Sequence, residues 1–152
     1  MSVGSFVFML HSHLPYYRKA GMWPFGEENL YECMSETYIP LLNAISELYD
    51  EGIKAKLTVG ITPILAEQLN DEHLQEGFIK YLDARIKAVS QDLERYPNPN
   101  VAHSQHLKYL AKYYYDWFTN IKDNFINKYN KNLITAFKKF QDLGCIEITT
   151  SG

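Results

Sequence analysis

The fold is decided by the stretch Phe6-Val7-Phe8-Met9-Leu10-His11-Ser12-His13-Leu14-Pro15-Tyr16-Tyr17. Its apolar first half predicts a β-strand over residues 6–10, and Pro15 prevents that strand from continuing. Side chains on a strand alternate between its two faces, so His11 and His13 are expected on the same face. In α/β sheets and barrels, the residues that do chemistry lie at the carboxyl ends of the strands. The histidine pair is therefore the first candidate site.

Working outward, strands and helices alternate along the chain. Further strands are predicted over residues 55–61 and 145–149, and a helix opens at Glu27, whose acidic first turn suits the positive end of the helix dipole. Pro40 is expected to interrupt that helix and start a second one, which Gly52 ends. Helices placed between strands predict an α/β fold with three parallel strands, which cannot close a barrel and leave an edge bare.

The segment between the second and third strands is almost entirely helical. Apolar residues at helical spacing predict helices over residues 75–96 and about 104–128, separated by Pro97-Asn98-Pro99-Asn100, and Asn132 can cap a third helix that Gly144 closes. Residues 75–143 are thus expected to form a helical insertion between strands two and three.

Composition limits the function classes. The chain has 152 residues, one domain or a piece of a larger one, with 46% apolar residues and a net charge of −3. That charge predicts no nucleic-acid or acidic-membrane partner, since either would need a basic surface. No apolar run approaches the ~20 residues that span a bilayer, and no secretion signal is visible. Cys33 and Cys145 are expected to be reduced thiols, which favours a cytoplasmic protein.

The residues alone leave three interpretations of the histidine pair open. The imidazoles could bind a divalent metal, could hydrogen-bond sugar hydroxyls, or could simply be packed and satisfied by backbone carbonyls. A functional role is favoured for a pair at a strand end. No HExxH motif or cysteine cluster accompanies it, so neither a metal nor another cofactor is expected.

The second candidate is the loop Trp23-Pro24-Phe25-Gly26-Glu27-Glu28. Its aromatic rings could form a stacking wall, with Trp23 and Glu28 contacting a sugar. Equally, the rings could cover the sheet while the carboxylates only cap a helix. Glu147 is expected to face solvent rather than to act in catalysis. The run Tyr113-Tyr114-Tyr115-Asp116-Trp117-Phe118 must spread around a helix, so some of its rings should be core and others exposed, with a partner or glucan surface as the minor alternative.

Four segments together carry a family resemblance. They are residues 11–16, residues 21–28, the stretch Gly60-Ile61-Thr62-Pro63-Ile64-Leu65-Ala66-Glu67-Gln68-Leu69, and residues 137–149. In this order, over essentially the whole chain, the sequence resembles glycoside hydrolase family 57, and within it the branch of 1,4-α-glucan branching enzymes.

The resemblance implies a fold, an activity and a set of site residues. The chain (1–152) would be the N-terminal portion of a distorted (β/α)7 catalytic barrel, and the chemistry a retaining transfer on α-1,4-glucans that makes α-1,6 branches. His11 and His13 would line the subsite beside the cleaved bond, with Trp23 and Glu28 as further substrate-binding residues. The partner would be an α-1,4-glucan such as amylose, glycogen or a maltooligosaccharide.

The sequence departs from the family pattern at its end. The family's second motif continues past the third strand into another histidine, and its glutamate nucleophile and aspartate acid/base lie on later strands. No residue up to Gly152 corresponds to either, so no catalytic residue is assigned here, and the chain alone is expected to be inactive. A retaining glycosidase needs two carboxyl groups about 5–5.5 Å apart.

Other functions stay open. Within the family, a 4-α-glucanotransferase or an α-amylase would share these motifs. A metal-dependent hydrolase or deacetylase would also use a strand-end histidine pair. A third possibility is a non-catalytic, glucan-binding fragment that supplies barrel strands to a partner chain.

Overall fold

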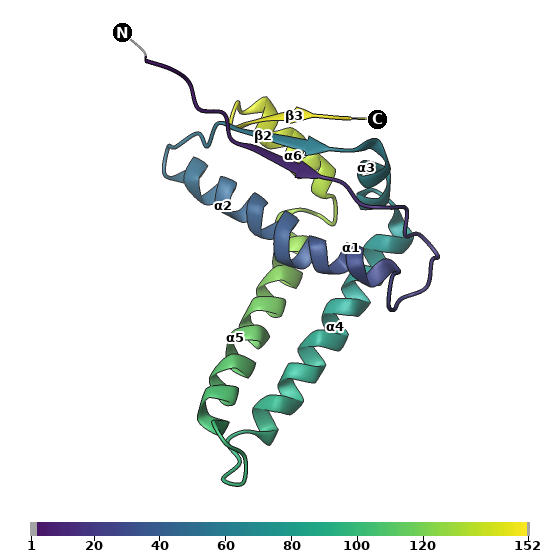
Figure 1. The fold of residues 1–152 in the computed structure, drawn as a ribbon, viewed down its shortest axis with the longest axis vertical. Helices are drawn as coiled ribbons and strands as arrows, with labels where there is room; N and C mark the ends of the chain where they lie inside the picture. The colour runs from purple at the N-terminus through teal and green to yellow at the C-terminus, as the bar shows by residue number, and fades with distance from the viewer. Residues whose placement is uncertain (1–2, 152) are drawn as a thin grey trace.

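The computed structural model describes residues 3–151, which form one mixed α/β unit with a protruding helical hairpin (Figure 1). The elements follow one another as β1 (Met9–Ser12), α1 (Glu27–Cys33), the π-helix η1 (Met34–Tyr38), α2 (Ile39–Asp50), β2 (Leu57–Ile61), α3 (Pro63–Leu69), α4 (Glu72–Arg95), α5 (Ser104–Asp123), the π-helix η2 (Asn124–Lys128), α6 (Leu133–Asp142) and β3 (Ile146–Thr149).

The three strands form one parallel sheet in the order β1-β2-β3, which confirms the predicted parallel α/β arrangement. In the sheet register His11 pairs with Gly60, and Gly60 pairs with Thr149. Neighbours in register point to the same face of a parallel sheet. One row of the sheet therefore presents His11, Gly60 and Thr149 together.

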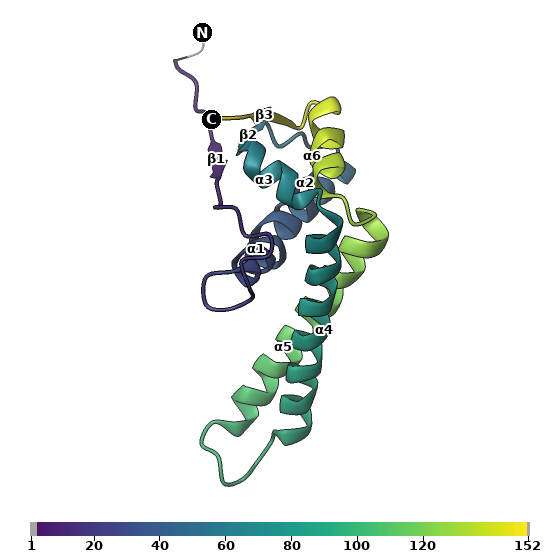
Figure 2. The same cartoon turned by 90° about the vertical axis from the view of Figure 1, so that its right-hand side faces the viewer.

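The two faces of the sheet differ in what covers them. Helices α2, α3 and α6 lie on one side, where Val59, Ile61 and Ile146 are buried (Figures 1 and 2). On the other side, where His11 and Glu147 are exposed, no element of the described chain packs. The histidine row thus lies on the open face.

An aromatic cluster anchors the helical hairpin to the rest of the core. Phe78 of α4 is fully buried and meets Phe125 of η2 edge to face at 4.9 Å between ring centroids. Tyr31 of α1, also buried, lies 6.0 Å from the Phe78 ring. Such pairs add to the burial energy of the rings themselves. Beyond this cluster, α4 and α5 pack mainly against each other as they project away from the sheet (Figure 2).

One predicted boundary was wrong and a second was right only in part, each for an identifiable reason. β1 begins at Met9 rather than residue 6, so His11 lies inside the strand instead of after it. Lys56, just before β2, has a φ of 56°, so the extended backbone of β2 begins only at Leu57, and the register between the two strands begins with Met9 opposite Thr58. Pro40 lies in the first turn of a new helix, α2, as predicted, but the chain stays helical before it, because η1 widens the turn, with the Ile39 N–H donating to the Met34 carbonyl.

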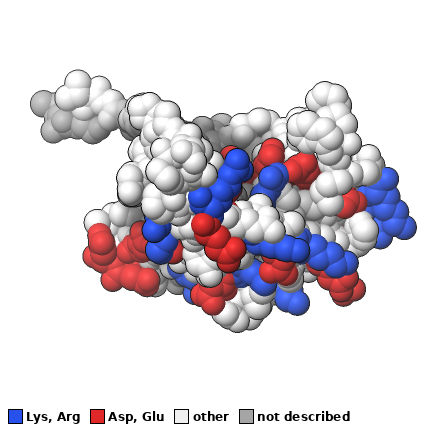
Figure 3. All heavy atoms as spheres, turned by 90° about the horizontal axis from the view of Figure 1, so that it is seen from below, with Lys and Arg blue, Asp and Glu red and all other residues white. Residues whose placement is uncertain are grey.

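The residues that begin or end individual helices were predicted correctly. Asn132 caps α6 by accepting a hydrogen bond from the Thr135 backbone, and Gly52 and Gly144, both at positive φ, follow α2 and α6. Within residues 3–151 no helix is long and apolar enough to cross a membrane. The face seen from below carries interspersed positive and negative side chains rather than a continuous basic surface (Figure 3).

Candidate functional site

The two histidines lie together on the open face of the sheet. The ring centroids of His11 and His13 are 6.5 Å apart and their planes are within 14° of parallel, which confirms that they share one face. Both side chains are exposed, and among the described residues neither imidazole makes a hydrogen bond. Their ring nitrogens can donate to or accept from a ligand above the sheet.

Gly60 makes room for His11, a role that the sequence analysis missed. A Cβ built on Gly60 would lie 3.1 Å from His11 Nδ1, closer than ordinary van der Waals contact. Its φ is not positive, so the glycine is required by this close approach rather than by backbone conformation. Glycine inside a strand often marks such an approach, and that is the feature that could have identified it.

Trp23 lies in the loop between β1 and α1 and is 77% exposed. The Glu27 backbone N–H donates to the Gly21 carbonyl at 2.8 Å, which closes this loop at its base. No ring contact in the described part of the chain joins Trp23 to either histidine. A stacking role for this indole therefore stays a prediction.

Glu28 has a structural partner. Its carboxylate forms an ion pair with Arg85 of α4, whose guanidinium lies 4.9 Å above the centre of the Tyr81 ring. The cavity beside it, about 340 Å³, is lined by these residues and by Met22, and it includes neither histidine. Glu28 thus fastens α1 to α4, and its proposed contact with a sugar also stays a prediction.

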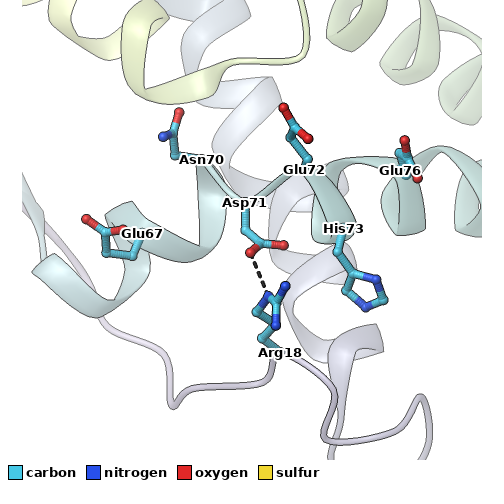
Figure 4. A pocket seen from close by; sticks show the side chains of 7 residues that line it. All are labelled: Arg18, Glu67, Asn70, Asp71, Glu72, His73 and Glu76. Carbon is cyan, nitrogen blue, oxygen red and sulfur yellow. Dashed lines mark hydrogen bonds and ion pairs between the residues drawn. The ribbon is translucent and has the colours of Figure 1, made fainter.

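A second polar cluster joins the segment after β1 to α3 and α4. A cavity of about 540 Å³ is lined by Arg18, by Glu67 and Asn70 at the end of α3, and by residues that open α4 (Figure 4). Arg18 Nε donates to Asp71 Oδ2 at 2.6 Å, while His73 extends toward the same side (Figure 4). Burial raises the pKa of Asp71, but hydrogen bonds from Arg18 and from the Leu74 backbone outweigh it, so the pKa is lowered overall.

Glu27 is the buried carboxylate of this region, only 7% exposed. It accepts hydrogen bonds from the Lys19 backbone at 2.7 Å and the Tyr31 hydroxyl at 3.0 Å, and its Oε1 lies 2.9 Å from His73 Nε2. Burial disfavours the ionised form, yet these bonds dominate and hold the pKa of Glu27 below its ordinary value. The same environment raises the pKa of Tyr31, by burial first and by its bond to Glu27 second.

The remaining candidates match their predicted surroundings. Glu147 is exposed, and within the aromatic run Tyr113 and Tyr114 are exposed while Trp117 and Phe118 pack against the core. Within residues 3–151 no group of three or more histidine, cysteine or acidic side chains is placed to hold a metal ion. Among the described residues, Cys33 and Cys145 are free thiols.

Comparison with known proteins establishes the family. The model of glycosyl hydrolase family 57 matches residues 7–152, and the chain belongs to this family. It is 40% identical to a 1,4-alpha-glucan branching enzyme of Thermococcus kodakarensis over 148 residues, which are 97% of this chain and 21% of that relative.

Solved structures agree with this assignment. The GH57-type branching enzyme from Pyrococcus horikoshii superposes with a TM-score of 0.86 at 36% identity, over 95% of this chain and 26% of that one. The branching enzyme from Thermococcus kodakaraensis, in complex with glucose and additives, gives 0.84 at 37% identity (95% and 24%). An alpha-amylase from Thermotoga maritima gives 0.81 at 32% identity (95% and 26%). The chain spans about a fifth to a quarter of these proteins.

Proposed function

We propose that this chain is the opening part of the catalytic barrel of a 1,4-α-glucan branching enzyme. The observation that carries the proposal is the histidine pair: two parallel, exposed imidazoles on the open face of a parallel sheet, at the carboxyl end of its strand. The similarity to branching enzymes along almost the whole chain supports it. In this proposal the open face becomes the inside of a distorted (β/α)7 barrel, and residues 75–143 are a helical insertion between β2 and β3, of which α4 and α5 project (Figure 1).

The proposed ligand is an α-1,4-glucan, the substrate class named for the relatives. His11 and His13 would hydrogen-bond hydroxyls of the sugar ring next to the cleaved bond and stabilise the charge that develops there. Trp23 and Glu28 would line the adjoining cleft. The nucleophile and the acid/base would come from the rest of the barrel, because a retaining mechanism needs two carboxyl groups facing each other across that bond. We place the protein in the cytoplasm, consistent with two free thiols.

The test is a chimera in which residues 7–152 replace the matching segment of the Thermococcus kodakarensis branching enzyme. We expect His13→Ala to lower turnover by about 100-fold or more, because a lost transition-state hydrogen bond of this kind costs about that much. His106→Ala, which removes an exposed histidine on α5, should leave turnover unchanged. Equal turnover in the two variants would contradict the assignment of His13.

A hydrolytic member of the family is the second candidate, since the Thermotoga maritima alpha-amylase superposes nearly as well. The products separate the two: a branching enzyme makes α-1,6 linkages, whereas an amylase makes only reducing ends. A metal-dependent hydrolase receives no support from the described residues.

A further inference from the structure

The segment that follows His13 is held in place by side chains of α1, of α3 and of the N-cap residue of α4. Residues 14–20, here called the post-histidine segment, contain no helix or strand. Four bonds nevertheless fix its backbone and Arg18 in place. They run from Gln68 to Pro15 and Tyr17, from Asp71 to Arg18, and from Glu27 to Lys19. Three of the four join residues more than 50 positions apart in the sequence.

Gln68 uses both ends of its amide on this segment. Its Nε2 donates to the Pro15 carbonyl at 2.9 Å, and its Oε1 accepts from the Tyr17 N–H at 2.6 Å. Gln68 itself is only 1% exposed, and its loss would leave the half-buried Tyr17 N–H and the Pro15 carbonyl without these bonds. A glutamate there would set a carboxylate against the Pro15 carbonyl, and a leucine would leave both backbone groups without a partner. The bonding pattern therefore requires an amide.

Glu27 completes the support from the other side. Its carboxylate receives the Lys19 N–H, while its own backbone N–H closes the Trp23 loop at Gly21. Gly77 of α4 allows this arrangement, because a Cβ there would lie 2.0 Å from the Tyr31 hydroxyl oxygen that donates to Glu27. Glu27 thus joins three parts of the chain: its carboxylate bonds the post-histidine segment and His73 of α4, and its backbone N–H closes the Trp23 loop.

We propose that Gln68 and Glu27 are positioning residues for His13 and Trp23. Neither touches the open face, but Gln68 fixes the chain two residues after His13, and Glu27 fixes both ends of the loop that carries Trp23. The inference rests on the proposed function, because it deepens the account of the same glucan site. In this proposal, a buried hydrogen-bond network away from the open face of the sheet determines how precisely His13 and Trp23 are placed.

Hydrogen exchange of the chimera that carries residues 7–152 tests the anchoring without any glucan. We expect Gln68→Leu to speed exchange of the Tyr17 backbone amide by about tenfold or more. Glu27→Gln should speed exchange of the Lys19 backbone amide by a smaller factor, because the side-chain oxygen of the new glutamine can still accept a hydrogen bond from it. The matched controls are Gln75→Leu, whose amide bonds the Leu69 carbonyl instead, and Glu67→Gln, an exposed carboxylate on α3. Unchanged exchange around Phe78 shows that each variant keeps its fold.

Binding of maltoheptaose to the same variants tests the consequence. We expect both loosened variants to bind it several-fold more weakly than the controls. Exchange that does not rise, or that rises equally in the controls, overturns the anchoring. Faster exchange with unaltered maltoheptaose affinity overturns the positioning role. If the chimera with unmodified residues 7–152 fails to bind maltoheptaose, the glucan part of both proposals fails, while the exchange rates still decide whether Gln68 and Glu27 hold the segment.

Discussion

Replacing Gly60 with alanine should impair the glucan site while leaving the fold intact. The added methyl group would lie 3.1 Å from His11 Nδ1, and ordinary contact begins at 3.4 Å, so the imidazole must shift by about 0.3 Å. Misplacement by 1 Å costs about 100-fold in rate, so this shift predicts about a fourfold loss of kcat/KM, or roughly 0.8 kcal/mol. Stability should be unchanged or slightly higher, since alanine lowers the entropy of the unfolded chain.

The assay uses the chimera defined above, with kcat/KM for branching and the urea midpoint measured on the same preparations. Gly60→Val extends the series, because its two further methyl groups cannot be accommodated by so small a shift, and we expect a loss of about 100-fold. Thr58→Val is the matched control: it changes the same face of β2 two register positions away, beside Met9 and Glu147. Unaltered kcat/KM in both Gly60 variants would refute the argument that Gly60 makes room for a working His11.

Three further predictions concern stability and are read from urea unfolding. Gly77→Ala should destabilise the chain by about 1–3 kcal/mol through its clash with Tyr31, although alanine normally favours a helix interior; a gain in stability would show that the clash relaxes freely. Phe78→Ala should cost about 3–5 kcal/mol, because the ring is fully buried in the aromatic cluster, and a loss below 1 kcal/mol would contradict that packing. Acidification should destabilise the chain: Glu27 and Asp71 have lowered pKa values when folded, so their contribution is complete above about pH 5 and is lost as the pH falls through those lowered values. In Glu27→Gln the midpoint should depend less on pH over this range, and an identical dependence would remove Glu27 from the explanation.

The parts of the fold that depend on local chemistry could be predicted from the sequence. Asn132 caps its helix, and Gly52 and Gly144 follow theirs, because each effect involves only residues within one or two turns. The strand-end histidine pair was also visible, since alternation along a strand needs no knowledge of the rest of the fold.

The parts of the fold that depend on residues distant in the sequence could not be predicted. Where β1 begins depends on Lys56, which lies far later in the chain, just before the start of the neighbouring strand β2. Likewise, Glu27 was expected only to cap a helix or to contact a sugar, and its bond to His73 spans 46 positions. No periodicity indicates that Gln68 faces Pro15 rather than solvent. Only the packed structure brings such pairs together.

The most direct test of the central claim is the intact mass of the native product in its own cells, measured after capture with an antibody against residues 3–151. The account predicts a mass several-fold above the 17.7 kDa of this chain, since the matching relative is about five times as long. A product of 17.7 kDa would contradict it, because no pair of catalytic carboxylates is assigned within these residues. A glucan-binding or strand-supplying role would then replace the branching enzyme as the leading hypothesis.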